Sequence, residues 1–219
     1  MISDRNLFLR HLGQTSESPM LVEIARAEGV YLYGPDGKRY LDLISGIGVS
    51  NVGHHAPEVV RAVQEQAGKY MHAMVYGEFV LSPQTRLAAR LCEVLSPKLD
   101  NVFFTNSGSE AVEGALKLCK KYTGRQEILA FHRSYHGSTH GALSVTGCPE
   151  LKAGYGPFLP GVGFLEFNSY TDLERITDKI AGVIVEPIRG EAGVEMPDPA
   201  WLKALRARCT AVGTLLILD

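Results

Sequence analysis

A turn of small residues between an apolar stretch and a helical pattern is the first candidate for chemistry. Ser107, Gly108 and Ser109 follow the apolar residues 101–104, which predict a buried strand, and apolar side chains then recur at helical spacing. Ser107 with Glu110 three positions later is typical of a capping box. The first amides of a helix lack internal partners and carry the positive end of its dipole, so this turn predicts an anion or phosphate site. An ordinary capped helix start without a ligand is the alternative.

Four apolar stretches, each short enough to be a central strand, end beside groups that could do chemistry. The carboxyl ends of parallel strands meet at one edge of an open α/β sheet, and such sheets bind ligands at that edge. The turn at Ser107 follows the first stretch, and the groups that follow the others are Tyr135 with His136, Glu186, and Asp219. We therefore expect one shared ligand site.

Each of these side chains also has an ordinary structural interpretation. Tyr135 could be a half-buried loop aromatic, Asp219 could cap a following helix, and Glu186 could be a buried acid paired with a core base. His136 could tune a ligand or hold its loop, and the second role is favoured.

The order and spacing of several motifs resemble the class III, or subgroup II, aminotransferases, which are pyridoxal-phosphate enzymes of fold type I. The resemblance covers nearly the whole chain and is to acetylornithine, ornithine and 4-aminobutyrate aminotransferases. The motifs are Gly53-His54 before Pro57, Thr105 to Lys117, Phe131 to Thr139, Glu186-Pro187 with Gly190-Glu191 and Gly193, and the stretch ending at Asp219. It implies an α/β fold with a mostly parallel sheet covered by helices on both faces.

The resemblance also implies which residues hold pyridoxal 5'-phosphate. Gly108 and Ser109 would bind its phosphate, Tyr135 would stack on its pyridine ring, and Asp219 would pair with the ring nitrogen as the catalytic carboxylate. The whole cofactor site would comprise Ser107, Gly108, Ser109, Tyr135, His136, Glu186 and Asp219. No metal is expected.

Substrate recognition departs from the resemblance at one position. Ornithine-type and 4-aminobutyrate-type relatives carry an arginine after the His-Gly pair to hold a substrate carboxylate, whereas this chain has Ser138. A hydroxyl cannot replace a bidentate guanidinium. Arg133 and Arg189 lie nearby in the sequence and could substitute for it, but a solvated surface arginine is the favoured interpretation of each. Glu191 and Tyr76 are the implied residues on the substrate side.

In this family the lysine that forms the Schiff base with the cofactor lies downstream of the Asp219 position. None of the nine lysines of the chain matches that motif. We therefore expect a truncated N-terminal portion that does not transaminate alone. The favoured function is transamination between an amine or amino acid, ornithine-like or another omega-amino compound, and a 2-oxo acid. A truncated, noncatalytic phosphate-binding or cofactor-binding fragment is the alternative, as is a mutase or decarboxylase of the same fold.

Composition agrees with a globular protein that acts on small molecules. The chain has 219 residues, of which 45% are hydrophobic and 21% charged, so it can bury a substantial core. Its net charge of −2 gives no basic field for nucleic acid or anionic membrane. The four cysteines form no C-x-x-C pair, and no segment approaches the ~20 apolar residues of a membrane span. A cytoplasmic location is expected.

The pattern predicts an N-terminal segment, residues 1–55, and a partial large cofactor-binding domain, residues 56–219. An antiparallel hairpin is expected around Gly34-Pro35-Asp36-Gly37. Helices are expected from Pro57 to about Lys69, after Ser82-Pro83, and after Asp198-Pro199 with Trp201 in the core.

Residues 70–76 are aromatic, rich in methionine and nearly uncharged. In the family this region lies near the active site and the dimer contact, so the resemblance implies a homodimer. Ordinary core is the alternative for this segment. If it is exposed, it should promote aggregation.

Overall fold

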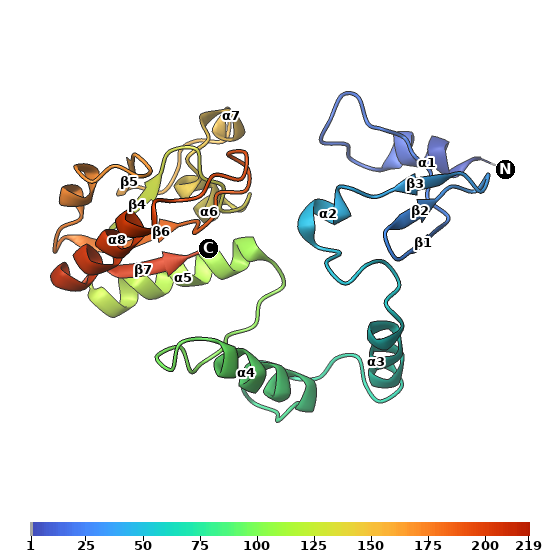
Figure 1. The fold of residues 1–219 in the computed structure, drawn as a ribbon, viewed down its shortest axis with the longest axis horizontal. Helices are drawn as coiled ribbons and strands as arrows, with labels where there is room; N and C mark the ends of the chain where they lie inside the picture. The colour runs from blue at the N-terminus through green and yellow to red at the C-terminus, as the bar shows by residue number, and fades with distance from the viewer. Residues whose placement is uncertain (1) are drawn as a thin grey trace. The chain divides into compact units, whose positions relative to one another are not determined.

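The computed structural model describes residues 2–219, and the chain forms two compact units (Figure 1). The N-terminal unit ends at Arg90, and the C-terminal unit runs from Leu91 to Asp219. The boundary expected between residues 55 and 56 lies inside the N-terminal unit. Most of the candidate site residues belong to the C-terminal unit.

The N-terminal unit contains a small antiparallel sheet with strand order β1-β2-β3. Leu32 of β2 pairs with Tyr40 of β3, and Gly37 has the left-handed φ of 81° that the connecting turn requires. This confirms the predicted hairpin. The elements are α1 (Asp4–His11), β1 (Arg26–Glu28), β2 (Tyr31–Tyr33), β3 (Arg39–Leu41), α2 (Ser45–Gly48), α3 (Pro57–Ala67) and α4 (Ser82–Val94), whose last turn crosses into the C-terminal unit.

The C-terminal unit is built on a parallel sheet with strand order β5-β4-β6-β7. This sheet, with its crossover helices, confirms the predicted α/β class. The elements are α5 (Gly108–Thr123), β4 (Glu127–Phe131), α6 (His140–Val145), α7 (Pro149–Lys152), β5 (Val162–Leu165), η1 (Asp172–Arg175), β6 (Ile180–Val185), α8 (Pro199–Val212) and β7 (Leu215–Leu218).

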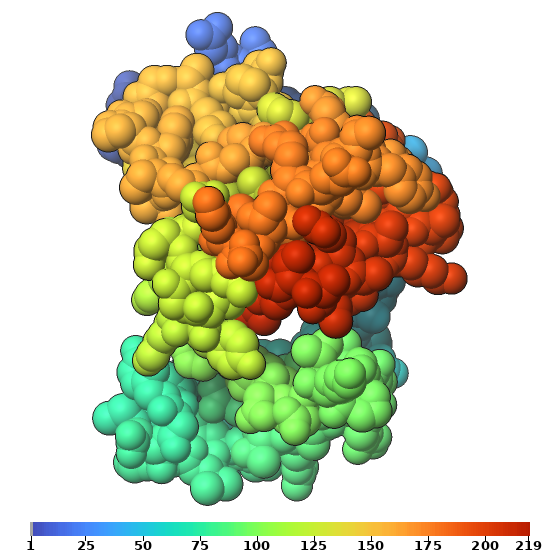
Figure 2. All heavy atoms as spheres, turned by 90° about the vertical axis from the view of Figure 1, so that its left-hand side faces the viewer, coloured from blue at the N-terminus to red at the C-terminus, as the bar shows by residue number. Residues whose placement is uncertain are grey.

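Two apolar layers lie on opposite faces of this sheet. Val112 and Leu116 of α5 and Val145 of α6 pack against one face. Trp201 and Leu205 of α8 pack against the other, where α8 also contacts η1. Figure 2 shows the red surface of α8 beside the orange segment that contains η1. The fully buried Trp201 confirms the expectation that this residue belongs to the core.

The strand predicted at residues 101–104 is wrong. This segment has no regular secondary structure, and the Phe103 side chain is 83% exposed. A strand forms only when its backbone groups find a hydrogen-bonded neighbour, and these residues pair with none of the described strands. An apolar run predicts the propensity for a strand but not the presence of a partner.

Ala111, Ala115, Leu118 and Cys119 lie at helical spacing and predict one buried face of α5, and the structure buries that face only at Cys119. The buried residues are Val112, Leu116 and Cys119, whereas Leu118 is 62% exposed. Cys119 approaches the sheet at Gly182 of β6, where a Cβ would lie 2.8 Å from the sulfur. The absent side chain of Gly182 therefore helps to decide which face of α5 turns inward.

Candidate active site

The N-terminus of α5 has the cap that the sequence predicts, in a shifted form. The Ser107 hydroxyl accepts a hydrogen bond from the amide of Glu110 at 3.2 Å. The Glu110 carboxylate reaches back to the amide of Asn106 at 2.7 Å, one residue before the usual capping-box partner. These caps engage the amides of Glu110 and Asn106, so the amides of Gly108 and Ser109 stay available to bind an anion. No heavy atom lies within 4 Å of the position of a Cβ on Gly108, so the approach to these amides is open.

The loop after β4 lies against this helix terminus. The amide of Ser138 donates to the Ser109 hydroxyl oxygen at 3.2 Å. Gly137 has a φ of 115°, and a Cβ there would overlap the Ser109 side chain. A glycine is therefore required for this close approach. The structure thus brings the predicted phosphate turn beside Tyr135 and His136.

His136 and Asp219 form a hydrogen-bonded pair across the carboxyl edge of the sheet. The Nδ1 atom of His136 lies 2.6 Å from a carboxylate oxygen of Asp219. The Asp219 backbone continues the β7 register, since its amide donates to the Val185 carbonyl at 3.0 Å. A carboxylate accepts hydrogen bonds, so we assign the proton to Nδ1. The imidazole is buried, and its Nε2 atom has no hydrogen-bond partner among the described residues.

Glu186 holds the Tyr135 loop from the end of β6. One carboxylate oxygen accepts from the amide of Tyr135 at 3.0 Å, and the other accepts from the amide of Gly190 at 3.2 Å. Glu186 is only 9% exposed, whereas Tyr135 is 38% exposed. Two backbone amides therefore satisfy the buried Glu186 carboxylate, and not a basic side chain of the core, which was the structural interpretation of this residue. Tyr135 keeps a solvent-accessible ring above a fixed backbone.

The expectation that Arg189 is a surface arginine is wrong. Arg189 is 3% exposed, and its guanidinium lies 4.0 Å from the centroid of the Phe167 ring. It donates to the His132 carbonyl at 2.7 Å and forms an ion pair with Glu195. Aromatic stacking and a paired carboxylate offset the cost of burying this charge. Arg133 does lie at the surface, with its side chain 65% exposed.

The two residues predicted on the substrate side lie in different units. Glu191 is exposed near the tip of the 189–195 hairpin and lines a cavity of about 340 Å³ together with Tyr135. Tyr76 belongs to the N-terminal unit and is 82% exposed. Their substrate roles stay predictions.

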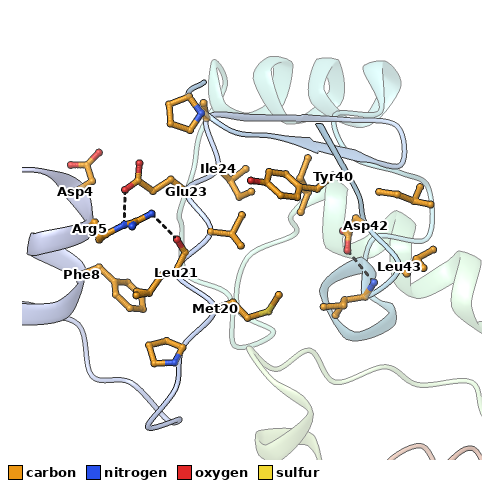
Figure 3. Close-up of a pocket in the computed structure, with 17 residues that line it drawn as sticks. Asp4, Arg5, Phe8, Met20, Leu21, Glu23, Ile24, Tyr40, Asp42 and Leu43 are labelled. Atoms are coloured by element: carbon orange, nitrogen blue, oxygen red, sulfur yellow. Dashed lines mark hydrogen bonds and ion pairs between the residues drawn. The ribbon is translucent and has the colours of Figure 1, made fainter. Parts of the chain in front are cut away.

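A larger cavity, of about 770 Å³, lies in the N-terminal unit (Figure 3). Its lining is mostly apolar, and three of its charged side chains, Arg5, Glu23 and Asp42, are engaged within the unit. Arg5 pairs with Glu23 at 3.2 Å. Asp42 lies 2.7 Å from His54, and this hydrogen bond, with those from backbone amides, lowers the pKa of Asp42. None of the predicted site residues lines this cavity, so we place the candidate site at the carboxyl edge of the parallel sheet.

Lys152 is the lysine of the C-terminal unit whose ammonium is most clearly committed to the fold. Its Nζ donates to the carbonyls of Ser144 and Thr146 at 3.0 and 3.1 Å, which satisfies the end of α6. Partial burial lowers the pKa of Lys152. A lowered pKa is common for amines that form Schiff bases, but this one serves the backbone. The expectation that no lysine of the chain has the Schiff-base role stays a prediction.

Comparison with known proteins identifies the family. The family model for aminotransferase class-III matches residues 12–219. The chain belongs to the class-III aminotransferases. Acetylornithine aminotransferase of Lactiplantibacillus plantarum is 44% identical over 90% of this class-III chain and 49% of the relative. The Methanopyrus kandleri acetylornithine aminotransferase is 40% identical over 95% of the chain and 53% of its own length. The chain spans about half the length of these curated relatives.

Solved structures confirm the fold of this class-III chain. One is taurine:2-oxoglutarate aminotransferase of Bifidobacterium kashiwanohense, solved with PLP and glutamate. The match covers 97% of this chain and 54% of the length of that enzyme, with a TM-score of 0.87 and 33% identity. The match to ornithine aminotransferase of Toxoplasma gondii covers 97% of this chain and 51% of the length of that enzyme, with a TM-score of 0.85 and 28% identity. Among residues 2–219, no helix is long and apolar enough to cross a bilayer.

Proposed function

We propose that this chain is the pyridoxal-phosphate-binding part of an aminotransferase that moves an amino group between an amine or amino acid and a 2-oxo acid. The observation that carries this proposal is the His136–Asp219 pair at the carboxyl edge of the sheet. The loop that carries His136 also contacts the Ser107–Ser109 turn, through the hydrogen bond from Ser138 to Ser109. Bound pyridoxal phosphate supplies an electron sink for the substrate Cα. The residues present fit that group, because an open helix terminus and an anchored carboxylate suit its two charged ends.

The amides of Gly108 and Ser109 would bind the phosphate at the positive end of α5. Asp219 would hold a proton on the ring nitrogen, because an adjacent carboxylate favours the cationic form of a pyridine. His136 would orient that carboxylate through its Nδ1–H, at the observed 2.6 Å. This is more than the loop-holding role that the sequence favours for His136.

Tyr135 would position the pyridine ring by stacking, which contributes about 0.5–1.5 kcal/mol beyond buried area. Glu186 would act indirectly, since it fixes the backbone of Tyr135. Glu191 and Tyr76 would contact the substrate. We further propose a cytoplasmic homodimer, in line with the family resemblance.

The names of the relatives support an omega-amino donor without deciding which one. Acetylornithine, ornithine and taurine aminotransferases all match this chain. All three names denote donors with an amino group remote from, or at the opposite end to, an acidic group. We therefore propose an omega-amino compound as the donor and a 2-oxo acid as the acceptor.

The phosphate cradle can be tested by Gly108→Val. Gly108 is the first residue of α5, lies outside the left-handed φ range and has free space around its Cβ position, so the substitution should leave the fold intact while filling the space that a phosphate needs. We expect at least tenfold weaker binding of pyridoxal phosphate by equilibrium dialysis, a loss of about 1.4 kcal/mol. Gly114→Val, in the open middle of the same helix, is the matched control. Equal affinity of the two variants would contradict the cradle.

A further inference from the structure

Two side chains on α5 hold the loop that follows β4. The Ser109 hydroxyl oxygen accepts from the amide of Ser138 at 3.2 Å, and a Glu113 carboxylate oxygen accepts from the Thr139 hydroxyl at 2.8 Å. Positions four apart lie on one face of a helix, so a single strip of α5 makes both contacts. The same loop carries two residues of the proposed cofactor site.

Glu113 also caps α6 from outside that helix. The oxygen that contacts Thr139 accepts from the amides of Gly141 and Ala142 at 2.8 and 3.3 Å. These amides belong to the first turn of α6 and lack partners within it. Thr139 is the N-cap residue, but its own side chain makes no cap hydrogen bond. A Cβ on Gly141 would overlap the Glu113 carboxylate, so a glycine gives this contact its room.

The part of the loop that Glu113 holds is not held by the core. Residues 138–140 are exposed, whereas residues 141–145 of α6 are buried. Packing therefore places α6, and hydrogen bonds to α5 place the exposed connection before it. Removal of the Glu113 carboxylate should loosen this connection, and the amide of Ser138 with it, while the buried part of α6 stays in place.

The amide of Ser138 decides how the Ser109 hydroxyl can be used. A serine hydroxyl has one hydrogen to donate and two lone pairs that accept. The amide occupies a lone pair, and among residues 2–219 no acceptor engages the hydroxyl hydrogen. Ser109 is therefore set to donate to an anion at the N-terminus of α5.

We propose that Glu113 is a positioning residue for the cofactor phosphate. It holds residues 138–140 on α5, which keeps the amide of Ser138 on the Ser109 oxygen and directs the Ser109 hydroxyl toward the phosphate. The carboxylate acts through these residues and not by contact, because a like charge would repel the phosphate. This inference rests on the proposed function, in which the Ser107–Ser109 turn binds that phosphate.

The test compares the affinities of the full chain for pyridoxine 5'-phosphate and for pyridoxine by equilibrium dialysis. Neither probe has an aldehyde, so neither reacts with surface lysines. The ratio of the two affinities measures the contribution of the phosphate alone. Glu113→Ala should lower this ratio about threefold to tenfold, the range for one hydrogen bond of ordinary strength. A general loss of structure would weaken both probes and leave the ratio unchanged.

A conservative variant separates the hydrogen bonds of Glu113 from its charge. One carboxylate oxygen accepts all three bonds, so Glu113→Gln can keep them through its amide oxygen. We expect its ratio to stay within about twofold of the wild-type value. Lys121→Ala, in the exposed last turn of the same helix, is the matched control. A loss in Glu113→Gln as large as that in Glu113→Ala would overturn the proposal.

A double-mutant cycle tests whether Glu113 acts through Ser109. Ser109→Ala should lower the ratio at least as much as Glu113→Ala does, because it removes the donor itself. Adding Glu113→Ala to Ser109→Ala should then cause little further loss, since residues that act in one chain of contacts are not additive. Additive losses would contradict the proposed route.

Hydrogen exchange of the ligand-free chain measures the loop without any cofactor. The amide of Ser138 should exchange at least about threefold faster in Glu113→Ala than in wild type or Glu113→Gln. Faster exchange with an unchanged affinity ratio would show a purely structural role and overturn the proposal, as would unchanged exchange. A wild-type chain that does not prefer the phosphate form would contradict the cradle as well. If Gly108→Val loses that preference and Glu113→Ala keeps it, only the role of Glu113 is wrong.

Discussion

At the scale of single residues, the candidate site depends on groups that are ordinary alone and unusual together. Asp219 is a carboxylate at a strand end, and His136 is a buried imidazole whose hydrogen bond to Asp219 engages its Nδ1. The amide of His136 donates to the Thr146 hydroxyl at 3.1 Å, which fixes the backbone that carries the ring. The hydrogen bond from His136 therefore fixes the orientation of the Asp219 carboxylate before any ligand binds. Such preorganisation strengthens the binding of a charged ligand.

Asp219→Asn tests this arrangement directly. The substitution keeps the size and a hydrogen-bonding oxygen but removes the charge, so it should weaken binding of pyridoxal phosphate about tenfold. The Asp219 side chain is 30% exposed, so screening keeps the effect well below the ~4 kcal/mol of a shielded pair. Equilibrium dialysis measures it, and Asp178→Asn at the surface is the control. An affinity unchanged from that of the control would remove the proposed role of Asp219.

At the scale of elements, a short hairpin and a helix terminus fix the site as much as the sheet does. The amide of Arg189 donates to the Glu195 carbonyl at 2.9 Å, and that of Glu195 returns to the Arg189 carbonyl at 3.0 Å. The buried Arg189 side chain ties this hairpin to the end of β4 through the His132 carbonyl. The hairpin that carries Glu191 is thus clamped at its base, although its tip is exposed.

Arg189→Met should lower the free energy of unfolding by about 1–3 kcal/mol. This is less than the 3–5 kcal/mol for a fully buried pair, because Glu195 remains 38% exposed and can be hydrated. Arg133→Met, at a position 65% exposed, should change it by less than about 0.5 kcal/mol. Urea denaturation of both variants gives the comparison. Equal stabilities would show that the Arg189 clamp contributes little.

The cap of α8 should make stability depend on pH in the acid range. Asp198 accepts from the amide of Ala200 at 2.9 Å and from the Tyr170 hydroxyl at 2.9 Å, and these bonds, the backbone one first, lower the pKa of Asp198. A lowered pKa in the folded state stabilises the fold above the ordinary value of 3.8, and that stabilisation is lost as the pH falls through the lowered pKa.

We therefore expect Asp198→Ala to lower the melting temperature near neutral pH, with a difference from wild type that shrinks below about pH 4. Asp198→Asn keeps an acceptor for the Ala200 amide but cannot titrate, so its melting temperature at neutral pH should fall less than that of Asp198→Ala. Melting curves between about pH 2 and pH 7 provide the measurement. A difference between alanine variant and wild type that is constant with pH would contradict this account of the cap.

At the scale of the whole molecule, both units expose large apolar side chains. Met71 is 88% exposed and Val80 is 92% exposed in the N-terminal unit, and Phe103 is 83% exposed in the C-terminal unit. Contiguous apolar surface on a soluble protein marks an interaction site or an aggregation hazard. The methionine-rich segment is therefore available for the contacts that the proposed homodimer needs, and the ordinary-core alternative does not fit these exposures.

Self-association should accordingly depend on residues 70–80, which comprise the methionine-rich segment and the exposed Val80 that follows it. We expect the weight-average mass in sedimentation equilibrium to rise with protein concentration, and Met71→Ser with Val80→Ser to reduce that rise. Tyr122→Ser removes a side chain that is 76% exposed on α5, outside the segment, and should have a smaller effect. If all the variants associate alike, contacts of residues 70–80 do not drive assembly.

Residue types and their spacing along the chain were enough to predict the α/β class, the hairpin, the cap at Ser107, the helix after Asp198-Pro199, and which strand ends carry functional groups. These are properties of local chemistry and of short-range spacing, so they can be inferred without knowing which segments pair. The strand at residues 101–104 failed as a prediction because pairing is not local.

Three features depend on contacts between distant segments: His136 pairs with Asp219, Arg189 is buried on Phe167, and Val112 rather than Leu118 faces the sheet. His136 and Asp219 are 83 residues apart in the chain and meet because β6 lies between β4 and β7. Strand order and the burial of charge are set by contacts between distant segments, which spacing along one chain does not encode.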